Sequence, residues 1–422
     1  MKILVTSISY FPEQTGFAPH TSALCEYLVN RGHKVIVMTG FPNAPYWSRW
    51  LEYRGKFIQK EYINNVEVFR ITHYIPRQAR RLLQRLFMEG SFCLLAGLIA
   101  FIKWRSHWDV IVYVGAQPSI AMLARLIAWF YKVPYVVKIT DLAAQAAADV
   151  GIIHASWLRR LLENFEYSAY SHARGVIVLC SGFKEALVAN HYPAELIRII
   201  HDSVNLEQIR PVSSGHIFRH DNRLSIEDFV ILYSGSMGLK QGLINVIEAA
   251  RILKNECPEI KWVIVGDGEL KPMLQKLILD YNLYEQVRLL PLQPESEMAI
   301  MFSSADVLLL NQLSKVKDTV IPSKLLTYMA AGKAILAAVN PYSQAAGLIH
   351  ESKCGIIVPP EDPIALANAA KEMKINSKSL KELGQYSRQY AEKYFDRKQI
   401  VAAQETFLLE VVKKAKQPFI RA

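Results

Sequence analysis

Three segments in the second half of the chain carry the residue types of a phosphate-binding site. Residues 316–332 have the sequence VKDTVIPSKLLTYMAAG, in which Pro322, Ser323 and Lys324 would lie in the first turn of a helix that ends at Gly332. The first turn of a helix favours an anion, because its N–H groups are unpaired and it carries the positive end of the helix dipole. An ordinary capped helix with a solvated lysine is the alternative.

The other two segments place glycines where a strand would pass into a helix. Residues 235–242 have the sequence GSMGLKQG, and residues 265–270 have the sequence VGDGEL. Glycine permits close approach of the backbone to a ligand, and Lys240 supplies a cation that can meet a diphosphate. The G-x-x-x-x-G-K-[ST] order of a P-loop and the third glycine of a dinucleotide fingerprint are both missing. Together the three segments predict a site for a phosphate-bearing ligand.

Length and composition predict a globular protein of two domains. The chain has 422 residues, 51% of them hydrophobic and 21% charged, which is too long for one comfortable core. Its five cysteines are scattered without a C-x-x-C pair, as is typical of a reducing compartment without structural disulfides or zinc. The initial segment MKILVTSISYF lacks a small-residue cleavage site, so we expect a strand there and a cytoplasmic protein.

The net charge of +11 is uneven along the chain. Residues 1–210 contain 23 Lys and Arg against 15 Asp and Glu, whereas the remainder contains 26 against 23. An excess of base on one domain favours an anionic surface as a partner, either phospholipid or nucleic acid. No nucleic-acid motif accompanies the charge, so we expect no nucleic acid as a partner.

Residues 77–105 are the candidate for contact with an anionic membrane. Four arginines, at positions 77, 80, 81 and 85, precede an unbroken run of eleven apolar residues from Phe92 to Ile102. This run is too short to span a bilayer, but it suits a helix in the interface whose basic residues meet anionic headgroups. A buried crossover helix with exposed arginines is the alternative.

Strand and helix patterns alternate along the whole chain, which predicts a doubly wound α/β fold in two halves. Residues 206–227 lack periodicity and are expected to be a linker or long loop. Strands are expected at 2–9, 35–40, 66–71, 109–115, 134–141, 175–181 and 196–204, and again at 229–236, 261–268, 287–292, 306–311, 334–339 and 355–360. Ligands of such sheets bind at the carboxyl ends of the strands. This rule predicts a cleft between the domains, surrounded by Gly16, Asp141, Ser236, Gly266 and Leu292.

The ordered set PSKLLTYMAAG, LYSGSMGLKQG and VIVGDGEL, with the YFPEQTG loop and the KITD strand end, resembles the retaining, nucleotide-sugar-dependent glycosyltransferases of GT-B type, family GT4. The resemblance covers nearly the whole chain. It is nearest to the bacterial subgroup that builds exopolysaccharide, O-antigen or colanic-acid-type units, including its fucosyltransferase-like members. It implies two Rossmann-like domains with a cleft between them. Residues 1–205 would face the membrane and hold the acceptor, residues 206–396 would bind the nucleotide sugar, and a last helix within 397–422 would return to the first domain.

The resemblance also assigns roles to single positions. The implied donor-binding residues are Gly16, Ser236, Gly238, Lys240, Gly266, Leu292, Asp318, Ser323, Lys324 and Leu325, and the implied acceptor-binding residues are His20 and Asp141. Lys240 and Lys324 would stabilise the charge that grows on the leaving diphosphate. Asp141 would act as the base, or would orient the acceptor. No D-x-D sequence occurs, so we expect these cations to act without a metal or cofactor.

Four positions depart from the family's pattern. Thr319 and Thr327 stand where many members have glutamates, and Asp318, one residue out of register, is the expected substitute for a carboxylate on the sugar hydroxyls. Ser236 replaces a frequent arginine, and Thr140 replaces a frequent histidine.

The expected function is therefore transfer of a sugar from a nucleotide-diphosphate sugar to a polyprenyl-diphosphate-linked or other saccharide acceptor at the inner face of the cell membrane. One alternative is a nucleotide-sugar epimerase of the same fold, which would turn over donor without acceptor. Another is a non-catalytic, membrane-bound partner in polysaccharide assembly, for which Thr319 and Thr327 are the main support.

Overall fold

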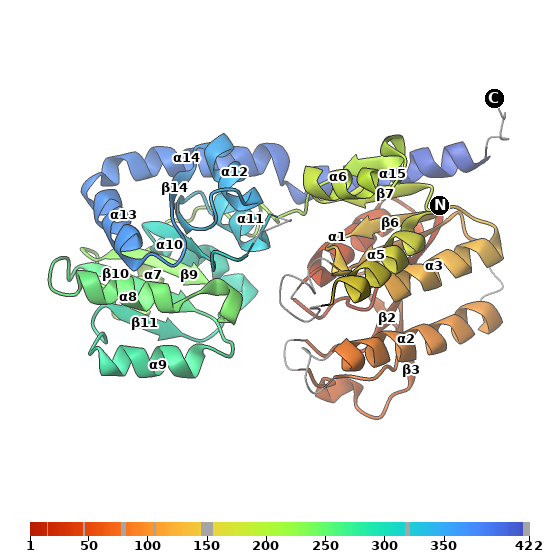
Figure 1. Ribbon diagram of the computed structural model, residues 1–422, viewed down its shortest axis with the longest axis horizontal. Helices are drawn as coiled ribbons and strands as arrows, with labels where there is room; N and C mark the ends of the chain where they lie inside the picture. Colours follow the sequence, from red (N-terminus) through yellow and green to blue (C-terminus); the bar gives the residue numbers. More distant parts are fainter. Residues whose placement is uncertain are drawn as a thin grey trace. The chain divides into compact units, whose positions relative to one another are not determined.

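The computed structural model of the chain describes residues 1–14, 16–44, 47–76, 82–103, 107–144, 155–316 and 321–416. The chain divides into two compact units, Met1–Asp202 with Lys398–Ala422, and Ser203–Arg397. Each unit is built on a sheet of mostly parallel strands with helices packed against it (Figure 1). The predicted fold class, two doubly wound α/β units, is confirmed.

The first unit contains an eight-stranded sheet. Its strands are β1 (Lys2–Thr6), β2 (Lys34–Gly40), β3 (Ile58–Ile63), β4 (Val66–Ile71), β5 (Val110–Gly115), β6 (Tyr135–Ile139), β7 (Gly175–Val178) and β8 (Ile197–Ile199). Their order is β3-β4-β2-β1-β5-β6-β7-β8, with β3 antiparallel to β4. Sequence reasoning missed β3, because this edge strand alternates exposed and half-buried residues and so lacks an apolar run.

Helices cover both faces of this sheet. They are α1 (Ala18–Asn30), α2 (Leu82–Lys103), α3 (Pro118–Tyr131), α5 (Ser156–Tyr170), α6 (Ser181–Ala189) and α15 (Arg397–Lys416), with single 3₁₀ turns η1 (Leu51–Tyr53) and η2 (Ala194–Leu196). α1 and α15 share one hydrophobic cluster with the alternate residues Val110, Val112 and Val114 of β5. α2, α3 and α5 lie side by side, and the Tyr135 hydroxyl of β6 donates to carbonyls of both α3 and α5 (Figure 1).

The last helix, α15, packs on the first unit although it follows the second unit in the sequence. A Cβ atom added to Gly175, at the start of β7, would lie 2.6 Å from the Phe407 ring and 2.9 Å from Val411. Glu405 on the same helix accepts a hydrogen bond from His33 at 2.8 Å. Apolar contact and this hydrogen bond therefore hold α15 in place.

The second unit contains a six-stranded parallel sheet. Its strands are β9 (Phe229–Ser234), β10 (Ile260–Val265), β11 (Val287–Leu290), β12 (Val307–Asn311), β13 (Ala334–Ala338) and β14 (Gly355–Val358). Their order is β11-β10-β9-β12-β13-β14, so the direction of winding reverses between β9 and β12. Ligands of doubly wound sheets bind at such a reversal, outside the carboxyl ends of the strands.

Helices cover both faces of the second sheet as well. They are α7 (Gly215–Asp221), α8 (Ile244–Leu253), α9 (Lys271–Asp280), α10 (Met298–Ser304), α11 (Ser323–Ala330), α12 (Gln344–Ser352), α13 (Pro363–Ile375) and α14 (Ser377–Tyr394), with 3₁₀ turns η3 (Leu239–Gln241) and η4 (Glu295–Glu297). Trp262 of β10 enters one hydrophobic cluster and its neighbour Val263 enters the other. The strands are thus buried on both sides, which explains their continuous apolar sequences.

The prediction of a linker or long loop at 206–227 is wrong for its middle part, where α7 forms. Phe218 is 6% exposed and packs in the core. Arg219 forms an ion pair with Asp306 at 2.8 Å and donates to the carbonyl of Ser304 at 2.8 Å. Sequence reasoning missed this helix because its sequence is mostly polar. The buried Phe218 ring and Arg219 attach it to the rest of the unit.

Candidate active site

The carboxyl ends of β9 and β10 are joined by backbone contacts that require glycine. A Cβ atom on Gly266, whose φ is +145°, would lie 1.9 Å from the carbonyl oxygen of Gly235. A Cβ atom on Gly268 would lie 2.7 Å from the backbone of Met237. The two glycine-bearing segments that the sequence singled out therefore lie against each other at the carboxyl edge of the sheet.

The third segment reaches the same edge through Lys324. α11 begins at Ser323, and Pro322 precedes its first turn as the cap residue. The Lys324 ammonium donates to the Tyr233 hydroxyl at 2.7 Å and lies 4.0 Å from the centroid of that ring. A Cβ atom on Gly235 would lie 3.1 Å from the Lys324 Nζ atom. The side chain thus brings a positive charge to the end of β9.

Tyr233, which the sequence analysis did not single out, fixes the position of this lysine. Burial raises the pKa of Tyr233, so its phenol stays neutral and keeps a proton to donate. That proton goes to the carbonyl oxygen of Ser236 at 2.6 Å, while the phenol oxygen accepts from Lys324. One hydroxyl therefore connects the glycine segment to the cation.

We expect Tyr233→Phe to lower kcat/KM for the sugar transfer predicted from the sequence about 10-fold, which corresponds to one hydrogen bond to a charged group. The ring and its packing remain, so the melting temperature should change little. Tyr328→Phe is a matched control. In the described part of the chain, the Tyr328 hydroxyl bonds only to the backbone of Ser234: it accepts from the N–H at 2.8 Å and donates to the carbonyl at 3.2 Å. Equal loss of activity in both variants would show that Tyr233 supports the sheet rather than Lys324.

Lys240 lies on η3, and its side chain is exposed. The carbonyl oxygen of Lys240 accepts from the Leu313 amide at 2.9 Å, and the Asn311 side chain donates to the Gln241 carbonyl at 2.6 Å. These bonds tie the turn to the end of β12. Lys240 and Lys324 therefore both stand at the carboxyl edge where β9 and β12 meet.

The other residues of the predicted donor-binding set differ in their positions. Ser236 and Ser323 are exposed, Gly238 is half-buried beside Ser236, and Leu292 follows β11 and is 63% exposed. Leu325 is fully buried in the core, and its amide donates to the Pro322 carbonyl at 2.9 Å. The structure thus gives Leu325 a packing role and leaves neither its side chain nor its N–H at the edge. Asp318 lies outside the described residues, as does Thr319.

In the first unit, the predicted residues lie at the carboxyl edge of the sheet. Gly16 has a φ of +61°, and no atom lies within 4 Å of the place where its Cβ would be. His20 lies in the first turn of α1 with its Nε2 atom 3.7 Å from Asp202, whose other oxygen accepts from the buried Lys138 at 3.2 Å. Asp141 is half-buried and follows the end of β6 by two residues.

Glu166 is a buried carboxyl beside Asp141 that sequence reasoning missed. It lies on α5, is 1% exposed, and accepts hydrogen bonds from the amides of Ala143 at 2.9 Å and Ala144 at 3.2 Å. Burial raises the pKa of Glu166 to about 7, and the charge of Asp141 adds to the rise while the hydrogen bonds oppose it. The available signal was a Glu four residues before Tyr170 on the inner face of an amphipathic helix.

This raised pKa predicts a pH-dependent stability. An unfolded Glu titrates near 4.5, so between pH 4.5 and 7 the folded chain binds more protons than the unfolded chain. Stability is then greatest below the unfolded pKa and falls as the pH rises to about 7, by up to about 3 kcal/mol for this group. We expect Glu166→Gln to reduce the drop in melting temperature between pH 5 and 8. Glu163→Gln, on the same helix, should keep the drop, and an unchanged drop in the Glu166 variant would refute the assignment.

Among the residues that the structure describes, no group of three His, Cys, Asp or Glu side chains could hold a metal ion. None of the five cysteines forms a disulfide, and four of them are buried.

Two protein-family models match the chain. The model described as a glycosyl transferase 4-like domain matches residues 15–202, and the model described as glycosyl transferases group 1 matches residues 217–390. Each matched range lies within one structural unit.

Individual proteins and structures are similar over nearly the full length. The chain is 28% identical over 410 residues to the putative colanic acid biosynthesis glycosyl transferase WcaI of Escherichia coli strain K12, covering 95% of this chain and 98% of that protein. Its structure is similar to sucrose-phosphate synthase from Thermosynechococcus elongatus, with a TM-score of 0.74 at 18% identity over 98% and 99% of the two chains. It is also similar to HepE of Anabaena in complex with UDP-glucose, with a TM-score of 0.69 at 16% identity over 98% and 100%. At these identities the structural matches show the fold.

Proposed function

Because residues 15–202 and 217–390 match two glycosyltransferase families and the chain is a glycosyltransferase of GT-B fold, we propose that it transfers a sugar from a nucleotide-diphosphate sugar to a lipid-linked saccharide. These matches confirm the expected resemblance to GT4-like glycosyltransferases of GT-B fold, and they confirm the enzyme class. The product would be a bacterial surface polysaccharide, as the colanic-acid name of the E. coli relative suggests. The UDP-glucose bound to HepE supports the class of donor.

The observation that carries the proposal is the position of Lys324 at the glycine-lined end of β9. In this account the donor diphosphate lies along the Gly235–Gly238 backbone, with Lys324 on one side and Lys240 on the other. The α11 N-terminus adds the amides of Ser323 and Lys324. As the anomeric C–O bond breaks, negative charge grows on the diphosphate, and these fixed groups stabilise it more than they stabilise the intact donor. The protein's own cations would perform this task, and no metal would be required.

The acceptor is proposed to bind at the carboxyl edge of the first sheet. Asp141 would take the proton from the attacking hydroxyl or orient it, and Glu166 would hold the 143–144 backbone that follows Asp141. His20 would contact the acceptor from α1. Retention of configuration at the anomeric carbon is part of the proposal and follows the GT4 resemblance.

The proposed location is the inner face of the cell membrane, with α2 in contact with lipid. Within the described residues, the segment Leu83–Ile102 is long and apolar enough to cross a bilayer by length and composition. However, Phe92, Ala96 and Ala100 on one side of α2 are fully buried in the unit, whereas Leu83 and Leu94 on the other are more than 65% exposed. A helix packed in this way favours contact with the membrane surface over a span, as expected for an amphipathic interfacial helix.

The test is transfer itself. The full-length protein is incubated with UDP-, GDP- and dTDP-sugars, with and without a polyprenyl-diphosphate-linked saccharide, and products are separated by mass. We expect a product heavier by one sugar that forms only with the acceptor and keeps the anomeric configuration of the donor. Donor epimerised without acceptor would support the epimerase instead, and absence of turnover with intact donor binding would support the non-catalytic alternative.

A further inference from the structure

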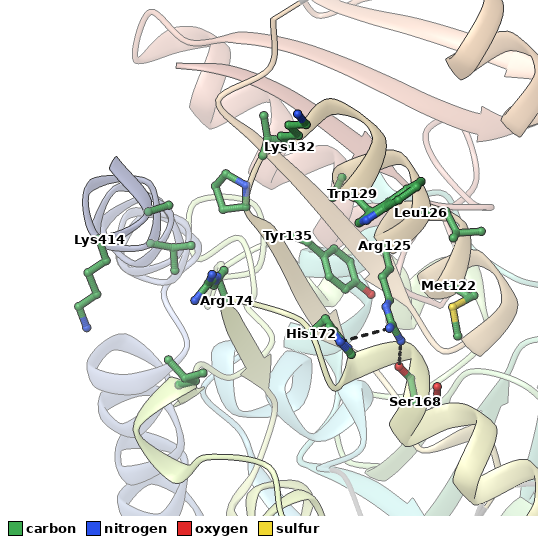
Figure 2. Close-up of a pocket in the computed structure, with 16 residues that line it drawn as sticks. Met122, Arg125, Leu126, Trp129, Lys132, Tyr135, Ser168, His172, Arg174 and Lys414 are labelled. Carbon is green, nitrogen blue, oxygen red and sulfur yellow. Dashed lines mark hydrogen bonds between the residues drawn. The ribbon is translucent and has the colours of Figure 1, made fainter. Parts of the chain in front are cut away.

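The first unit contains a pocket of about 1150 Å³ that the proposed reaction does not use (Figure 2). Its lining includes Pro134, Arg174 and Leu196, which directly precede β6, β7 and β8. The pocket is thus at the amino-terminal end of the sheet. Because reactants of doubly wound folds bind at the carboxyl end, this pocket lies on the side of the unit away from Asp141 and Gly16.

The polar side of the pocket is positively charged. Arg125, Lys132, Arg174 and Lys414 line it together with His172, and no Asp or Glu is among its lining residues in the described chain. The Arg125 guanidinium donates to the Ser168 carbonyl at 2.5 Å and lies 3.4 Å from His172 Nε2, so it is held on the wall (Figure 2). The basic side chains on the pocket wall favour an anion as its ligand.

The other side of the pocket is apolar. Met122, Leu126 and Trp129 line it from α3, and Trp129 is 77% exposed (Figure 2). The apolar surface continues past the pocket, since the half-exposed Phe130 packs on Phe101 of α2 with ring centroids 5.0 Å apart. Cations facing a wall of this kind suit a ligand that is anionic at one end and apolar at the other.

We propose that this pocket binds an anionic glycerophospholipid of the bilayer, with the headgroup phosphate between Arg125, Arg174 and Lys132. Guanidinium groups bind phosphate oxygens in pairs, and lysines add point charges. The glycerol and the upper acyl chains lie against Leu126 and Trp129, in the manner of aromatic residues at a membrane interface. The proposal rests on the membrane location proposed above, but it does not depend on the transfer reaction. The pocket would add a specific lipid contact to the apolar surface of α2.

The test is flotation of the full-length protein with phosphatidylcholine vesicles, with and without phosphatidylglycerol. We expect binding that requires phosphatidylglycerol. Lys132→Gln/Lys414→Gln should weaken this binding about 25-fold, because each basic group near an anionic surface contributes roughly fivefold.

The control is Lys353→Gln/Lys413→Gln. Lys353 caps α12 with the same φ of 54° that Lys132 has as the cap of α3, and Lys413 adjoins Lys414 on α15 but does not line the pocket. The control removes the same charge, so it should bind like the wild type. Equal weakening in both double variants would overturn the proposal in favour of a general basic surface.

Calorimetry separates a lipid from free phosphate as the ligand. Short-chain phosphatidylglycerol below its micellar concentration should bind, and Trp129→Ala should weaken it about tenfold, since that side chain covers apolar area of the ligand. Inorganic phosphate should bind far more weakly and should not respond to Trp129→Ala. Comparable affinities of the two ligands, both insensitive to Trp129→Ala, would show a phosphate site and contradict the lipid assignment.

Discussion

Replacement of Lys324 by methionine is expected to lower kcat/KM for sugar transfer by about 10²–10³, the usual effect of removing one preorganised group that stabilises transition-state charge. Methionine has nearly the length of lysine and can lie on the Tyr233 ring, so the change removes the charge and little of the packing. The loss should fall mainly on kcat, since the charge on the departing diphosphate is greatest in the transition state.

Two controls sharpen this result. Lys324→Arg keeps a cation and should recover part of the activity. Lys353→Met removes the lysine that caps α12 in the same unit and should be neutral. If Lys324→Met kept wild-type kcat/KM while binding donor normally, Lys324 would have no part in catalysis.

Gly266→Ala is expected to have the second largest effect. The added Cβ would lie 1.9 Å from the Gly235 carbonyl, and φ at this position is +145°. Overpacking costs about 1–3 kcal/mol and the strained backbone a similar amount, against a typical total stability of about 5–15 kcal/mol. The second unit should therefore unfold at clearly lower urea, and the loop that would carry the diphosphate should shift even where the unit stays folded.

Gly347→Ala provides the comparison for this variant. Gly347 lies within α12 and has no atom within 4 Å of its Cβ position, so alanine should be neutral or stabilising by about 0.5–1 kcal/mol. Urea unfolding monitored by circular dichroism measures both. A Gly266→Ala protein as stable as the wild type, with unchanged donor affinity, would contradict the close packing of the two glycine segments.

Most of the fold could be predicted because parallel strands that are buried on both faces have continuous apolar sequences. β5 and β9 are examples of such strands. The same reasoning failed where burial is partial: β3 lies at an edge with polar side chains, and α7 is short and polar, with Phe218 and Arg219 among its few contacts to the core.

Residues of the candidate site could be singled out from the sequence where the residue type alone has a clear physical use. They could not be singled out where their contacts depend on the tertiary structure. Gly266 and Lys324 could be singled out because glycine permits close approach of the backbone, and because a lysine in the first turn of a helix places a cation beside the free N–H groups. From the sequence alone, Tyr233 is expected to be an aromatic residue of the core. Only the structure shows that its hydroxyl accepts a hydrogen bond from Lys324. The GT4 resemblance implies that Leu325 binds the donor, but one step along the helix from Lys324 turns the side chain by about 100°, here into the core. Glu166 is separated from Ala143 along the chain, and α5 brings the two together.

The central claim is that Lys240, Lys324 and the surrounding amides bind a diphosphate. Calorimetric titration of UDP, GDP and dTDP, each beside its monophosphate, measures this directly on the wild type and on Lys240→Met/Lys324→Met. For the nucleobase that the protein prefers, we predict that the wild type binds the nucleoside diphosphate about 100-fold more tightly than the monophosphate, since charged hydrogen bonds contribute about 1.5–3 kcal/mol each. It predicts that the double variant binds the two almost equally. A double variant that keeps the wild-type ratio would contradict the account.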